Sequence, residues 1–192
     1  TEGLKYIFQT KNDIYLLTSS GTGAMEAAVC NLLSSGDKAL VVECGKFSER
    51  WSELCKVYKA EAKIIQVEWG KAVNPSDIEK ALQADPDIKA VFITLCETST
   101  GVTPNVKKIG EVVSKSNAVL VLDAISGLGV EDVQTDNWSI DVVVTGSQKG
   151  LMLPPGLALI ALSERAWKAV ESCRSPRYYF DLRLSKKAWG QT

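Results

Sequence analysis

Short apolar and β-branched runs alternate along the chain with segments whose apolar positions recur at helical spacing. The runs predicted as strands are KALVVEC from Lys38, AKIIQV from Ala62, IKAVFIT from Ile88, AVLVLD from Ala118 and DVVVTG from Asp141. Helices are predicted between and after them, over residues 24–33, 48–58, 75–83, 105–114 and 164–171. This alternation is typical of an α/β three-layer sandwich, in which helices cover both faces of a mostly parallel sheet.

The chain changes direction after the strand DVVVTG. Too few residues, too rich in Pro and Gly, separate it from the run LALIAL for a helical crossover, so LALIAL is predicted as one antiparallel strand. The opening residues TEGLKYIFQTKND are predicted as helix or loop without a strand of their own. The aromatic and basic stretch over residues 174–184 is predicted to form an interface or an element at the substrate entrance.

Composition narrows the possible chemistry. The 192 residues are 45% hydrophobic, which fits one domain. With 22 basic and 23 acidic residues the formal charge is -1, so nucleic acid is not an expected partner. The absence of histidine excludes imidazole-ligated zinc and histidine-based catalytic triads or dyads within this chain, and no metal site is expected.

The expected cellular compartment and the expected state of the cysteines both follow from the distribution of apolar residues and cysteines along the chain. No apolar run is long enough to cross a bilayer, and no basic-then-apolar leader is present, so we expect a cytoplasmic protein without a membrane partner. The five cysteines lack close pairs and mostly interrupt apolar segments, as small buried residues of a reducing compartment do. Cys44 and Cys96 are accordingly expected to be buried fillers.

A small-residue stretch, SSGTGAMEA over residues 19–27, leads into a predicted helix. The unpaired N–H groups of its first turn, with the hydroxyls of Ser20 and Thr22, can hold a phosphate. An ordinary helix cap with a glycine turn explains the same residues equally well. The stretch lacks the Gly-Lys pair of a P-loop, and Glu26 stands where a dinucleotide fingerprint has its third glycine.

Three further polar stretches follow strands, where an open parallel sheet binds its ligands. VLVLDAISGLG ends its strand with Asp123. A carboxylate buried there needs a cation or hydrogen-bond donors, which a ligand can supply; alternatively, Asp123 caps a turn or a helix. CETSTGVTP places hydroxyls, including that of Thr98, after another strand, either facing a ligand or forming a polar turn. TGSQKGLMLPPG carries Lys149 to the sheet edge, where the amine can act as a nucleophile if neighbours desolvate it, or where it is an ordinary solvated surface charge.

Taken together, these stretches supply the parts of a pyridoxal phosphate site: a phosphate cradle, a carboxylate for a pyridinium nitrogen, hydroxyls and a Schiff-base lysine. In this order and spacing, they resemble the class V aminotransferases of fold type I, especially the alanine:glyoxylate (serine:pyruvate) branch, from about Asp13 to Trp189. The resemblance implies that Lys149 forms a Schiff base with pyridoxal 5'-phosphate and that Asp123 pairs with its ring nitrogen.

The resemblance also implies the other cofactor contacts. They are Ser20, Gly21, Thr22 and Gln148 at the phosphate, Thr98 near the phenolic oxygen, and Phe47 and Ile125 against the ring. Phe47 and Ile125 would look the same as ordinary core residues. Nearby, Arg50 is expected to be a surface or structural charge and Trp51 a packing residue.

The implied function is a transaminase that transfers an amino group from an amino acid to a small 2-oxo acid such as glyoxylate or pyruvate. The resemblance further implies that residues 1–192 form the large cofactor-binding domain of a homodimeric enzyme, a fragment without the N-terminal arm and the C-terminal small domain. SQK, in place of the His-Lys pair of cysteine desulfurases, favours transamination. Leu95 and Cys96, where the family often has His-Gly, depart from the pattern. A lyase or desulfurase-like enzyme, or a truncated cofactor-binding domain without turnover, are the alternatives.

Overall fold

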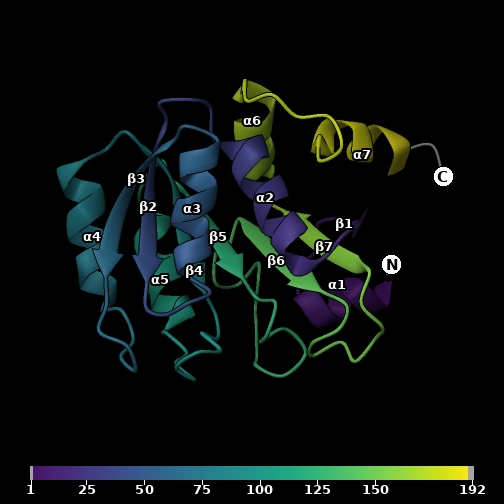
Figure 1. The fold of residues 1–192 in the computed structure, drawn as a ribbon, viewed down its shortest axis with the longest axis horizontal. Coiled ribbons are helices and arrows are strands. Elements are labelled where there is room, and N and C mark those ends of the chain that lie inside the picture. The colour runs from purple at the N-terminus through teal and green to yellow at the C-terminus, as the bar shows by residue number, and fades with distance from the viewer. Residues whose placement is uncertain (1, 190–192) are drawn as a thin grey trace.

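A seven-stranded sheet forms the centre of the computed structural model, which describes residues 2–189 (Figure 1). Its strands lie in the order β1-β7-β6-β5-β4-β2-β3. Their bounds are β1 Ile14–Thr18, β2 Lys38–Glu43, β3 Glu61–Gln66, β4 Ile88–Thr94, β5 Val119–Asp123, β6 Val142–Gly146 and β7 Leu157–Leu162. Strand β7 pairs antiparallel with both β1 and β6, while the pairs among β2 to β6 are parallel. The predicted fold class and the predicted antiparallel strand are confirmed.

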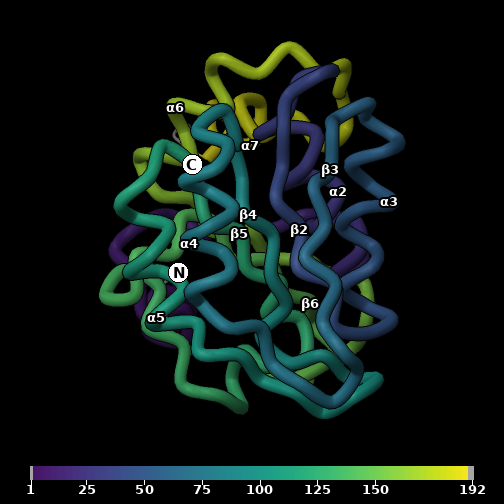
Figure 2. The backbone as a smooth tube through the Cα atoms, turned by 90° about the vertical axis from the view of Figure 1, so that its left-hand side faces the viewer, coloured from purple at the N-terminus to yellow at the C-terminus, as the bar shows by residue number. Residues whose placement is uncertain are grey.

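Helices cover both faces of this sheet, as the side view shows (Figure 2). The helices α2, α3, α6 and α7 pack on one face, and α1, α4 and α5 pack on the other. Their bounds are α1 Glu2–Phe8, α2 Gly21–Leu32, α3 Glu49–Val57, α4 Pro75–Ala84, α5 Val106–Val113, α6 Glu164–Ser172 and α7 Leu182–Trp189. None of the helices in the described part of the chain has the length and apolar composition that crossing a bilayer requires.

The central strands are buried on both faces, which explains their continuous apolar sequences. In β5, Val119 and Val121 join the core beneath α2 and α3, whereas Leu120 and Leu122 join the core beneath α4 and α5. This division follows from the two-residue side-chain period of a strand. Each fully buried aliphatic side chain of this kind contributes about 1.5–3 kcal/mol to folding.

Two elements were not predicted. Strand β1 follows the opening helix and consists of the short run IYLLT, whose partner is the antiparallel β7 far along the chain. Helix α7 lies within and beyond the aromatic stretch over residues 174–184. In addition, α2 begins at Gly21 and not at residue 24. The predicted start was too late because the first turn contains glycines, which are weak helix formers.

A buried asparagine in α2 anchors the segment that precedes α7. The Asn31 amide donates to the carbonyl of Phe180 at 2.6 Å and accepts from the Leu182 amide at 3.1 Å. The neighbouring Tyr178 and Tyr179 remain 85% and 66% exposed. The prediction that this stretch forms an interface or a substrate entrance stays a prediction.

At the opposite end of the sheet from the loops described below, a buried carboxylate joins β5, β6 and α6. Asp141 accepts from the Leu120 amide at 2.8 Å and the Ser163 hydroxyl at 2.7 Å, and it pairs with Arg165 at 2.5 Å. The side chain of Asp141 is 7% exposed, so removing it leaves these donors unsatisfied.

We expect Asp141→Ala to lower the free energy of unfolding by about 2–4 kcal/mol, because it breaks a largely buried, hydrogen-bonded ion pair. Urea denaturation followed by circular dichroism measures the change. Glu68→Ala is the matched control, since Glu68 pairs with Lys71 on the surface, where such pairs contribute little. Equal stability of the two variants would contradict the assignment.

Candidate active site

One pocket, of about 120 Å³, opens where strands β1, β2, β4, β5 and β6 end. All nine residues predicted to contact the cofactor line it: Ser20, Gly21, Thr22, Phe47, Thr98, Asp123, Ile125, Gln148 and Lys149. Three more residues share the lining, namely Arg50, Cys96 and Ser126. Because parallel strands end at the same edge of the sheet, loops far apart in sequence meet here.

The first turn of α2 presents unused donors to the pocket. Ser20 occupies the N-cap position but makes no side-chain capping hydrogen bond. Within the described residues, no backbone acceptor binds the amides of Gly21 and Thr22. A Cβ at Gly21 would lie 2.6 Å from the Ile125 Cδ1 atom, so a larger residue there does not fit without displacing Ile125. The turn can therefore hold an anion with free N–H groups, hydroxyls and the positive end of the helix dipole.

Asp123 ends the central strand β5 and is 5% exposed. Among the described residues, the Ile125 amide is its one hydrogen-bond donor, at 2.9 Å from Oδ1. Burial raises the pKa of Asp123 to about 6, against the opposing effects of the Ile125 amide and the positive charges of Arg50 and Lys149. A carboxylate so placed is stabilised by a cation that enters the pocket.

Hydroxyl and thiol groups form another wall. The Thr98 and Ser126 hydroxyls lie 2.8 Å apart and are hydrogen-bonded to each other. Ser126 belongs to the turn that follows Asp123, and its part in the pocket was missed from sequence. Cys96 is partly exposed and lines the pocket, so the expectation that it is a buried filler is wrong, whereas Cys44 is buried as expected.

Phe47 is presented by a tight turn that the buried carboxylate of Glu97 holds. This carboxylate accepts from the Ser48 amide at 2.8 Å, the Phe47 amide at 3.1 Å and the Ser99 hydroxyl at 2.8 Å. Burial alone would raise the pKa of Glu97, but these hydrogen bonds outweigh it and the pKa is lowered. Gly45 makes room for Glu97, since a Cβ there would lie 2.4 Å from its Cγ. Phe47 itself is 37% exposed and lines the pocket, so it is not a core residue.

Ile125 and Trp51 show the contrast between lining and packing. Ile125 is partly buried, packs against the core and also lines the pocket. Trp51 is fully buried and lies 4.7 Å from the Phe92 ring, so its prediction as a packing residue is confirmed. Arg50, expected as a surface or structural charge, instead lines the pocket and donates to the Thr22 hydroxyl at 3.0 Å.

Lys149 and Gln148 lie in the loop that connects β6 to β7. The Ser147 side chain secures this loop by donating to the Pro154 carbonyl at 2.7 Å, and the Leu153 amide donates to the Ser147 carbonyl. Lys149 is an exposed residue on the pocket wall, so of the two alternatives its amine is solvated in the chain as described. The stiff loop holds its backbone, while its amine remains accessible to a ligand.

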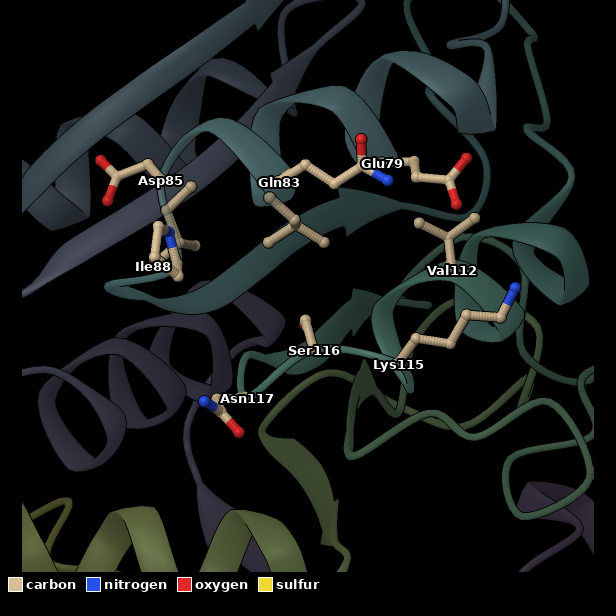
Figure 3. A pocket seen from close by; sticks show the side chains of 10 residues that line it. Glu79, Gln83, Asp85, Ile88, Val112, Lys115, Ser116 and Asn117 are labelled. Atoms are coloured by element: carbon tan, nitrogen blue, oxygen red, sulfur yellow. The ribbon is translucent and has the colours of Figure 1, made fainter.

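A roomier cleft of about 370 Å³ lies elsewhere, between α4 and α5 (Figure 3). Glu79 and Gln83 project into it from α4, with Lys115 and Asn117 beyond α5 on the other side. It adjoins the amino end of β4, away from the edge where the polar loops converge. None of the residues predicted from the sequence motifs lines it, so we place the chemistry in the smaller pocket.

Comparison with known proteins identifies the family. The family profile described as "Aminotransferase class-V" matches residues 2–175. The chain belongs to the class-V aminotransferases. It is 42% identical to the soluble hydrogenase small subunit of a Synechococcus species, over 97% of this chain and 50% of that protein. It is 40% identical to the L-aspartate–glyoxylate aminotransferase of Paracoccus denitrificans, over 95% of this chain and 47% of that protein.

Solved structures agree with this assignment. The crystal structure of ureidoglycine–glyoxylate aminotransferase from Bacillus subtilis superposes with a TM-score of 0.94 and 31% identity, covering 98% of this chain and 49% of that one. This class-V aminotransferase chain thus spans about half the length of the relatives it matches. Its pocket combines an accessible amine, a buried carboxylate and a helix N-terminus, a set that suits a phosphorylated, cationic aromatic ligand.

Replacing Asp123 with Asn should stabilise the ligand-free protein at pH 7 by about 1–3 kcal/mol, because it removes an ionised carboxylate that is poorly solvated. The raised pKa means that the folded state binds the proton more tightly than the unfolded state. The penalty is therefore absent at acid pH and grows as the pH rises through the range from about 4 to about 6. Urea denaturation at pH 4.5 and pH 7 should show a larger advantage of Asn at pH 7 than at pH 4.5, and a less stable Asn variant at pH 7 would refute this account.

Glu97→Gln should destabilise the fold by about 1–3 kcal/mol at pH 7, since an amide NH₂ group would face backbone N–H groups that now have an acceptor. Because the pKa of Glu97 is lowered, its contribution is present at neutral pH and is lost as the pH falls below the ordinary carboxyl range. Thermal and urea denaturation measure the effect. Glu53→Gln, on the exposed surface of α3, is the control, and equal behaviour of both variants would contradict the role of Glu97.

Proposed function

We propose that this chain forms the cofactor-binding part of a pyridoxal-phosphate-dependent aminotransferase, which moves an amino group from an amino acid to a small 2-oxo acid. The observation that carries the proposal is the meeting of Lys149, Asp123 and the first turn of α2 in one pocket. The names of the relatives point to glyoxylate as the acceptor, because it recurs among them with different amino donors.

The residues present fit this cofactor. Asp123, buried with one donor, would meet a protonated ring nitrogen, and the free N–H groups of α2 would meet the phosphate together with Ser20, Thr22 and Gln148. Phe47 and Ile125 offer apolar surfaces to a flat ring, and Thr98 offers a hydroxyl to its phenolic oxygen. When bound, pyridoxal phosphate supplies an aldehyde that condenses with amines and a ring that withdraws electrons from the substrate Cα.

The chain's own groups divide the remaining work. The Lys149 amine would hold the cofactor in the absence of substrate, and once a substrate amine has taken its place it would carry the proton between the substrate Cα and the cofactor's aldehyde carbon. Asp123 would keep the ring nitrogen of the bound cofactor protonated, because its negative charge favours the cationic form of a partner inside a poorly solvated site. The turn held by Glu97 fixes Phe47 at the pocket wall.

Since the chain spans about half the length of its relatives, the activity is proposed for the whole protein. We propose that residues 1–192 belong to the large domain of a homodimeric enzyme. The contacts to the substrate carboxylate and to the partner subunit would then come from outside this chain.

The test is to add pyridoxal phosphate, record the absorbance spectrum, reduce with borohydride and map the modified peptide by mass. We expect an imine band and a pyridoxyl group on Lys149, and loss of both in Lys149→Ala. In the whole protein, Lys149→Ala should lower amino transfer to glyoxylate by about 10²–10⁴-fold. Lys115→Ala, in the roomier cleft, is the control, and labelling that persists in Lys149→Ala would contradict the proposal.

A further inference from the structure

Arg50 is the one charged group of the pocket to which the proposed function gives no task. Its Nη1 atom donates to the Thr22 hydroxyl at 3.0 Å, and its guanidinium lies 5.5 Å from the centre of the Phe47 ring. The same positive charge acts on the Asp123 carboxyl and lowers its pKa, against the larger effect of burial. Arg50 therefore lies between the first turn of α2 and the aromatic wall of the pocket.

Most of the hydrogen-bonding capacity of this guanidinium is unused. The group carries five N–H donors, and within the described residues the Thr22 hydroxyl is the acceptor that it reaches. None of the ion pairs among those residues involves Arg50, because Glu49 pairs with Lys46 and Glu97 is bound by backbone amides. An arginine fork without a carboxylate partner on a pocket wall is suited to an oxyanion.

The position of its contact shows which end of a ligand it faces. Thr22 lies in the first turn of α2, beside the Gly21 amide that has no backbone acceptor and the Ser20 hydroxyl that makes no cap. Because the Thr22 hydroxyl accepts a hydrogen bond from Arg50, its own hydrogen is free to point at an anion. The Arg50 guanidinium and the first turn of α2 thus line the same part of the pocket.

We infer that Arg50 is a phosphate-binding residue of this pocket, supplying a fixed positive charge beside the helix terminus. That the phosphate belongs to pyridoxal phosphate rests on the proposed function. Arg50 lies in the first turn of α3, directly after the turn that Glu97 secures, and its amide donates to the Phe47 carbonyl at 3.3 Å. The backbone is therefore positioned before a ligand arrives, which lowers the entropic cost of binding.

The experiment compares pyridoxal phosphate with pyridoxal, which has the same aldehyde and ring but no phosphate. Dissociation constants are measured from the imine absorbance for the unmodified protein, Arg50→Met, Arg50→Lys and the control Arg174→Met, which replaces an exposed arginine away from the pocket. We expect Arg50→Met to weaken pyridoxal phosphate about 10- to 100-fold and pyridoxal less than about twofold. Arg50→Lys should recover part of the loss, because it keeps the charge but not the fork.

Equal weakening of both ligands in Arg50→Met would overturn the inference, since it would show an effect through Phe47 or the fold. Unchanged affinity for pyridoxal phosphate in Arg50→Met would also overturn it. If that variant lost only affinity for a substrate carboxylate, Arg50 would bind the substrate and not the phosphate. Arg174→Met should match the unmodified protein for both ligands.

A second readout separates this inference from the proposed function. Inorganic phosphate should raise the thermal unfolding midpoint more than sodium chloride of equal ionic strength, and Arg50→Met should lose that difference while Arg174→Met keeps it. This measurement does not involve Lys149. If no adduct forms on Lys149 but the phosphate effect depends on Arg50, the proposed function fails and the phosphate site stands. If the phosphate effect is the same in Arg50→Met, the inference fails.

Discussion

The common direction of strands β1 to β6 is the constraint on which the site depends. Because these strands run the same way, the loops that follow them open at one edge of the sheet. The antiparallel β7 adds to this arrangement, since its short connection from β6 returns at once and keeps Lys149 at the edge. An antiparallel connection needs no crossover helix, so the loop is short, and the prolines and the Ser147 hydrogen bond hold it in place.

Two buried carboxylates at this edge have pKa values shifted in opposite directions, because they accept different numbers of hydrogen bonds. Glu97 has several donors, so its pKa is lowered and its charge stabilises the turn that carries Phe47. Asp123 has one donor, so burial dominates and its pKa is raised. The first carboxylate is satisfied by the fold itself. The second is left for a cation from outside the chain, which is the usual compromise between stability and function at a binding site.

The positive groups of the pocket are arranged to complement these charges. Lys149 reaches the wall from the loop after β6, and Arg50 reaches it from the start of α3. Both lower the pKa of Asp123, although burial outweighs them. Together with the free N–H groups of α2, Lys149 and Arg50 make the pocket rich in hydrogen-bond donors, while Asp123 leaves an unpaired carboxylate on its wall. A ligand with both an anionic and a cationic part would therefore be oriented by charge alone.

The sequence by itself determined the α/β class and the antiparallel strand LALIAL, and the resemblance of its short motifs to a known family indicated nine of the pocket-lining residues. These features depend on local periodicity, on the length of a connection and on residues next to one another in the chain. Strand β1 was not predictable in this way, since its short run acquires a partner only through β7. The start of α2 was predicted too late, because glycines are weak helix formers, and one of them is there because Ile125 leaves no room for a side chain at Gly21.

Only the tertiary structure decided the rest of the site. Arg50 belongs to the pocket because Glu97, which follows a different strand, holds the turn before α3. Ser126 and Cys96 line the pocket for a similar reason, and the exposure of Lys149 was likewise settled only by the packing around its loop. Local sequence specifies which groups stand at the ends of strands, whereas the order of the strands in the sheet determines which of those groups face one another.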